Sequence, residues 1–103
     1  MLTVIESPEF IACAAKVWGD DERHAFVDWI SENPEAGDVI ANSGSLRKVR
    51  WSRAGMGKRA GARVIYFVRN ARDELVLVTV YTKGRIENIP AHLLRALKEK
   101  YDV

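Results

Sequence analysis

The chain has 103 residues, of which 48% are hydrophobic and 29% are charged, and its formal net charge is +2. This length predicts one domain spanning residues 1–103, and the composition excludes a disordered or fibrous protein. No apolar run approaches the roughly 18 residues that a membrane span needs, and no signal peptide is evident. The single cysteine, Cys13, fits a reducing compartment and is interpreted as a buried small hydrophobe. We therefore expect a cytoplasmic protein.

The charges are distributed unevenly along the chain. Asp38 and Asp73 bracket 34 residues, 39–72, that contain no acid and nine basic residues: Arg47, Lys48, Arg50, Arg53, Lys58, Arg59, Arg63, Arg69 and Arg72. That segment carries +9, whereas the rest of the chain holds seven bases and all 14 acids and carries −7. Such segregation is typical of a site for a polyanion. A solvated basic hairpin and a patch that meets an acidic protein are the alternatives.

Helix signals dominate the first third of the chain. Residues 2–6 are β-prone and predict a short strand, after which Ser7-Pro8 provides an N-cap and a first-turn proline. Gly19 predicts the end of this helix. The acids from Asp20 onward favour the start of a second helix, which Pro34 ends.

Strand signals dominate the rest of the chain. Turn residues predict a loop over 37–44, and strands are expected over 46–51, 62–68 and 75–82. The last of these is apolar almost throughout, which is typical of a central strand covered on both faces. Pro90 begins a final helix. The order β-α-α-β-β-β-α predicts an α+β fold with helices on one sheet face and the other face open.

Alternation along the basic strand groups its cations. If Val49 packs against the helices, Lys48 and Arg50 stand together on the opposite face, about 6 to 7 Å apart. Arg63 opens the next strand, beside the intervening loop. That loop, 52–61, contains three glycines together with Arg53, Lys58 and Arg59, so it could clamp phosphates. Its spacing is not that of a Walker A loop, and a flexible hairpin loop without catalytic meaning is the alternative.

RNA cleavage by attack of the 2′-hydroxyl requires a base, stabilisation of the phosphorane and a proton for the leaving oxygen. Arginine side chains suit the second requirement. Neighbouring positive charge favours the neutral form of a lysine, so Lys48 beside Arg50 is a candidate base or acid. Lys83 follows the last strand and could bring another charge to the same edge. Tyr81 could stack on a base or donate a proton, although burial in the core is an equal alternative.

Other sources of chemistry are weak in this sequence. His24 and His92 lie in predicted helices and are interpreted as structural. No cluster has metal-ligand spacing, and no Ser-His-Asp arrangement can be argued, so we expect no metal and no cofactor.

Four segments, 33–40, 43–51, 57–67 and 77–83, together resemble the HigB-like branch of the RelE/ParE superfamily. The resemblance runs through the whole chain and implies a RelE-like fold, with two N-terminal helices and a C-terminal helix around a small, mainly antiparallel sheet. It further implies the toxin of a type II toxin–antitoxin system, a metal-independent mRNA endonuclease that cuts mRNA on the ribosome and inhibits translation. The implied partners are the ribosome, mRNA and an antitoxin, often a helix-turn-helix protein of the HigA type.

The resemblance also implies roles for individual residues. The catalytic set that it implies is Lys48, Arg50, Arg63 and Lys83, and the RNA or rRNA contacts are Arg47, Arg53, Lys58, Arg59, Tyr81 and Arg85. Proteins of the RelE type carry a tyrosine near the C-terminal helix, and here the matching position is close to Pro90. Tyr81 or Tyr101 could take its place.

Two other functions fit the same fold. One is a ParE-like inhibitor that binds DNA gyrase, and the other is a catalytically weak RNA-binding or antitoxin-binding protein. The basic pair on one strand together with Arg63 favours RNA cleavage, because inhibition of gyrase requires no phosphate-clamping site.

Overall fold

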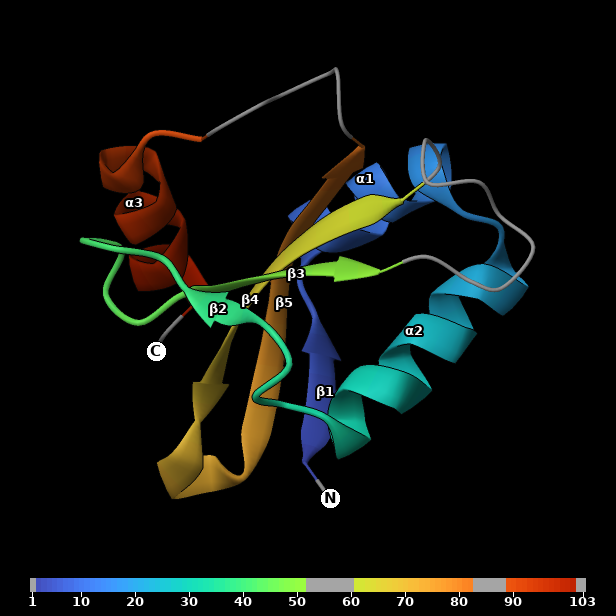
Figure 1. The fold of residues 1–103 in the computed structure, drawn as a ribbon, viewed down its shortest axis with the longest axis horizontal. Coiled ribbons are helices and arrows are strands. Elements are labelled where there is room, and N and C mark those ends of the chain that lie inside the picture. The colour runs from blue at the N-terminus through green and yellow to red at the C-terminus, as the bar shows by residue number, and fades with distance from the viewer. Residues whose placement is uncertain (1, 52–60, 83–88, 102–103) are drawn as a thin grey trace.

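The computed structural model describes residues 2–51, 61–82 and 89–101, which form a five-stranded sheet with helices on both of its faces (Figure 1). The strand order is β1-β5-β4-β3-β2, and only β1 and β5 run parallel. The predicted α+β class is confirmed. The elements are β1 (Thr3–Glu6), α1 (Pro8–Val17), α2 (Asp20–Glu32), β2 (Asp38–Val39), β3 (Arg47–Trp51), β4 (Ala62–Arg69), a 3-10 helix (Asn70–Arg72), β5 (Glu74–Thr82) and α3 (Ala91–Tyr101).

The predicted helix start at Ser7 is confirmed, and the helix ends at Val17, two residues before the predicted stop at Gly19. The Ser7 hydroxyl accepts from the Phe10 amide at 3.0 Å and donates to the Val78 carbonyl at 2.9 Å, which joins α1 to β5. Helix α1 ends at Val17, and Trp18 is extended. The chain turns at Trp18 because its indole packs between the Phe10 and Phe26 rings of successive helices. Gly19 is the N-cap of α2 instead.

Helices α1 and α2 cover one face of the sheet, here called the α1/α2 face. Its core combines helix side chains such as Phe10, Phe26 and Ile30 with Val64 and Leu77 from the strands, all of them buried. Burial of this apolar surface is the main driving force for the fold.

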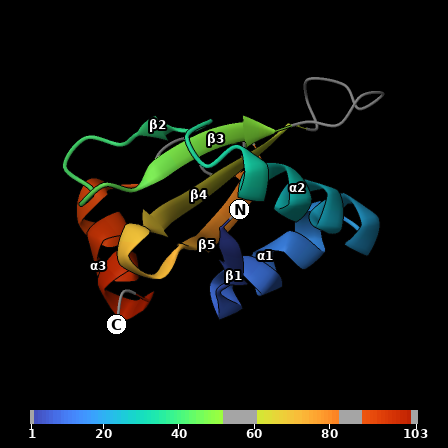
Figure 2. The same cartoon turned by 90° about the horizontal axis from the view of Figure 1, so that it is seen from below.

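Helix α3 covers part of the opposite face, here called the α3 face, so the expectation of an open second face is wrong. Figure 2 shows α3 on one side of the sheet and α1 and α2 on the other. Leu94 is buried there against Phe67, Val76 and Val78. The continuous apolar run of β5 explains this arrangement, because side chains on both of its faces have to leave water. The prediction of a strand covered on both faces is confirmed.

The loop expected over 37–44 contains the edge strand β2, which pairs with β3 in antiparallel register: Asp38 opposite Lys48 and Val39 opposite Arg47. Buried hydrogen bonds hold its start, because the Tyr66 hydroxyl accepts from the Gly37 amide at 2.9 Å and donates to the Pro34 carbonyl at 2.8 Å. This anchor decides where Asp38 lies.

Cys13 is only half-buried, so its interpretation as a core residue needs correction. The Thr79 hydroxyl donates a long hydrogen bond to its sulfur at 3.7 Å.

Among the described helices, none combines the length and the apolar character that crossing a membrane requires.

Candidate nucleic-acid interface

Packing of β3 against the helices decides where its cations point. Val49 and Trp51 belong to the core on the α1/α2 face, and the Trp51 ring lies 5.6 Å from that of Trp18 and 5.5 Å from that of Phe26. Successive side chains of a strand alternate between faces. Lys48 and Arg50 therefore lie together on the α3 face, as the sequence predicted.

Three side chains line up across the sheet on the α3 face. Arg63 of β4 shares this face with Ile65, which is buried under α3. Its register partners are Arg50 on β3 and Tyr81 on β5. Because neighbouring strands lie about 4.8 Å apart, these three residues form a row about 10 Å long. We call Arg50, Arg63 and Tyr81 the cross-strand row, and Lys48 lies two residues from its β3 end.

The row concentrates positive charge beside a buried tyrosine. Arg50 is exposed and Arg63 half-exposed, whereas the Tyr81 side chain is only 6% exposed. Burial raises the pKa of Tyr81, and the nearby charge of Arg63 partly opposes that rise. The phenol therefore remains protonated at neutral pH and can donate a hydrogen bond beside the Arg63 guanidinium. Forked donors of this kind bind phosphate oxygens in pairs.

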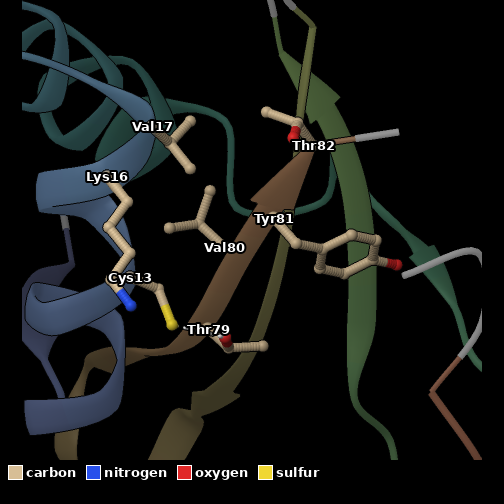
Figure 3. Close-up of a pocket in the computed structure, with 7 residues that line it drawn as sticks. All are labelled: Cys13, Lys16, Val17, Thr79, Val80, Tyr81 and Thr82. Carbon is tan, nitrogen blue, oxygen red and sulfur yellow. Dashed lines mark hydrogen bonds between the residues drawn. The ribbon is translucent and has the colours of Figure 1, made fainter. Parts of the chain in front are cut away.

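A cleft lies on the other side of β5 and is separate from this row. It has a volume of about 510 Å³ and is lined by Cys13, Lys16, Val17 and residues 79–82. Figure 3 shows Val80 directed towards α1 and the Tyr81 ring directed away from it. The Tyr81 ring therefore belongs to the α3 face, although its backbone borders the cleft.

Some predicted site residues do not join the row. Arg47 lies on the opposite face, where its guanidinium donates to the Gly37 carbonyl at 2.7 Å. Tyr101, the last residue of α3, is half-buried and packs against the cluster that contains Leu94. Five predicted residues, Arg53, Lys58, Arg59, Lys83 and Arg85, lie outside the described residues, as does segment 52–60 of the glycine-rich loop.

The two histidines, which the sequence analysis interpreted as structural, lie on different helices. His24 on α2 and His92 on α3 are both exposed. Within residues 2–51, 61–82 and 89–101, no group of three His, Cys, Asp or Glu side chains is arranged to hold a metal ion.

One residue near the row was missed by the sequence analysis. Asp38 lies directly opposite Lys48, although the sequence pattern identified it only as the border of the acid-free segment. No sequence signal could have found it, because a strand of two residues has no periodicity to recognise.

The order of the elements, with a mixed five-stranded sheet between α1/α2 and α3, defines a RelE-like α+β fold. A similar structure is that of an arginine-to-alanine double mutant of the E. coli toxin RelE in the free state, with a TM-score of 0.61 and 14% sequence identity over 99% of this chain and 98% of that one. The likeness establishes the fold. No protein-family model matches the sequence.

A second similar structure is the conserved hypothetical protein HP0892 from Helicobacter pylori. It matches 82% of this chain and 97% of its own at 13% identity, with a TM-score of 0.45. A score of this size is too low to support an argument about the fold.

Proposed function

We propose that this protein is the toxin of a type II toxin–antitoxin pair, a single RelE-like domain of the HigB-like branch that cleaves mRNA on the ribosome. The observation that carries the proposal is the register of Arg50, Arg63 and Tyr81 on the α3 face, with Lys48 beside them. Three cations and a tyrosine on neighbouring strand positions suit one scissile phosphate and its neighbour.

The proposed reaction is attack of the ribose 2′-oxygen on the adjacent phosphorus. The P–O2′ bond forms as the bond from phosphorus to the 5′-oxygen breaks, which leaves a 2′,3′-cyclic phosphate and a 5′-hydroxyl. Arg63 and Arg50 stabilise the charge that develops on the non-bridging oxygens. Lys48, as an ammonium, donates the proton that the leaving 5′-oxygen requires, while solvent takes up the proton of the 2′-hydroxyl. Tyr81 donates a hydrogen bond to the phosphate. Every step is proton transfer or charge stabilisation, so none is assigned to a metal or cofactor.

Residues outside the described part of the chain extend the proposal. We assign Lys83 as a further catalytic cation, and Arg53, Lys58, Arg59 and Arg85 as contacts to mRNA or rRNA. Arg47 is left out of the site because its guanidinium holds the Gly37 carbonyl on the other face. The proposed protein partner is an antitoxin with a helix-turn-helix domain of the HigA type.

The direct test is cleavage of ribosome-bound mRNA by the purified protein and its Arg63→Ala variant. We expect cleavage by the wild type and a loss of about 100-fold in kcat for Arg63→Ala, since the variant lacks a donor to the transition state. Arg72→Ala is the matched control, because Arg72 is an exposed arginine beyond the far end of β4.

Two results would overturn the proposal. Intact mRNA together with inhibited supercoiling by DNA gyrase would support the ParE-like alternative. Inactivity in both assays with retained binding to RNA or antitoxin would support the catalytically weak binding protein.

A further inference from the structure

An acid lies next to the most basic part of the described sheet. Asp38 on β2 is the register partner of Lys48, and register partners in antiparallel strands share a face. Lys48 in turn lies opposite Ile65, one row from the pair of Arg50 and Arg63. The carboxylate therefore borders a surface that would bind phosphates, where a negative charge opposes binding of the ligand.

Several contacts fix the position of Asp38. A strand of two residues is too short to be stable by itself, and Tyr66 secures it by bonding Gly37 and Pro34. Arg47 adds a third bond, from its guanidinium to the Gly37 carbonyl. A Cβ atom on Gly37 would lie 2.9 Å from the Tyr66 ring, so the close approach requires glycine. The residue after Gly37 is thus held firmly at the edge of β3.

We propose that Asp38 is the positioning residue for Lys48, an inference that rests on the proposed function. A lysine ammonium on its flexible four-carbon stem needs a partner to hold it over the reacting atoms. A carboxylate on the neighbouring strand supplies that partner from the side remote from Arg63. Among the described residues no closed ion pair joins the two side chains, so the ammonium keeps donors available for RNA.

The role predicts a split between catalysis and binding. Asp38→Asn leaves Lys48 without its orienting partner, so we expect kcat on ribosome-bound mRNA to fall about tenfold. The same change removes a negative charge beside the phosphates, so RNA affinity should stay equal or increase. Asp38→Glu should restore part of kcat. Glu35→Gln is the matched control, because Glu35 is an exposed acid in the same turn without a partner on β3.

A purely structural role for Asp38 makes a different prediction. In that case kcat and affinity would fall together with the unfolding temperature. Unchanged kcat in a folded Asp38→Asn variant would also overturn the proposal.

Zero-length cross-linking tests the juxtaposition without any RNA. A carbodiimide joins a carboxylate to an amine in reach, with loss of one water, and mass spectrometry identifies the linked peptides. We expect a link between Asp38 and Lys48 in the wild type, with the link between Glu9 and Lys100, whose charged atoms lie 2.7 Å apart, as internal control. A control link without the Asp38 link would overturn the proposal. If the links form but the wild type cuts no RNA, the proposed function fails and the positioning role fails with it, whereas the juxtaposition stands.

Discussion

Arg63 on β4 and Tyr81 on β5 lie directly opposite each other on the α3 face of the sheet. The other register partner of Arg63 is Arg50 on β3. One guanidinium is therefore flanked by a like charge on one side and by a buried phenol on the other. The pairing offers neither an ion pair nor a packed apolar contact, which are the usual stabilising cross-strand pairs. This combination is informative because it fits the binding of an anion better than it fits stability.

The first prediction concerns the pKa of Tyr81. The Arg63 charge lowers this pKa against the effect of burial, so Arg63→Ala should raise the pKa of Tyr81 further and Arg63→Lys should change it little. Absorbance of tyrosinate as a function of pH measures the effect, and a Tyr81→Phe variant identifies the signal of Tyr81. An identical titration in Arg63→Ala would place the two side chains apart.

Two buried tyrosines predict how the stability of the protein changes at alkaline pH. Burial is the main cause that raises the pKa of both Tyr66 and Tyr81 above 10.0. A group whose pKa is raised in the folded state contributes stability that is fully present below its unfolded pKa and is lost as the pH rises through the folded pKa. The contribution of these two tyrosines to the free energy of unfolding, measured with urea, should therefore stay constant as the pH approaches 10 and decrease above pH 10. Tyr81→Phe should make that fall shallower.

Because Arg50 and Arg63 carry like charges, replacement of Arg50 should raise the stability of the protein and weaken its binding to RNA. Arg50→Thr should raise the free energy of unfolding by about 0.5 kcal/mol, because like charges directly opposite in a sheet destabilise it. The same change should weaken RNA binding and reduce the slope of log affinity against log salt by about 1. Urea unfolding and binding assays at several salt concentrations measure both. Lower stability together with an unchanged salt slope would exclude Arg50 from the phosphate contacts.

Removal of the Tyr66 hydroxyl oxygen should lower the free energy of unfolding substantially. Tyr66→Phe leaves the buried Gly37 amide and the Pro34 carbonyl without their partner and should lower the free energy of unfolding by about 2 kcal/mol. Tyr101→Phe is the control, because the Tyr101 hydroxyl has no hydrogen-bond partner among the described residues. The free energy of unfolding of this variant should differ from that of the wild type by less than about 0.5 kcal/mol. Equal effects in the two variants would contradict the role of Tyr66 as the anchor of β2.

Much of the sheet could be predicted because its signals are local. The β-branched and aromatic residues of β4 and the apolar run of β5 specify strands regardless of what packs on them, and the structure moves their predicted ends by only one residue at 69 and 74. The facing of Lys48 and Arg50 was also predictable, since it follows from the alternation set by Val49.

Tertiary contacts explain what the sequence could not predict. Strand β2 exists because the Tyr66 hydroxyl and Arg47 hold Gly37, and these partners lie 29 and 10 residues away along the chain. The end of α1 is set by burial of Trp18 rather than by Gly19. Alternation along each strand could group residues within that strand, but the register that aligns Arg50, Arg63 and Tyr81 depends on pairing between strands. The role proposed for Lys83 stays a prediction, because it lies outside the described residues.

The most direct test of the central claim, an RNA-cleaving toxin that depends on Arg63, is the rate of protein synthesis in cells after induction of the wild-type protein or of Arg63→Ala. We predict that amino-acid incorporation stops soon after induction of the wild type, with cellular mRNA cleaved and DNA intact, and that it continues in cells with equal amounts of folded Arg63→Ala. Unchanged protein synthesis with accumulating DNA breaks, or equal toxicity of the two proteins, would contradict the account.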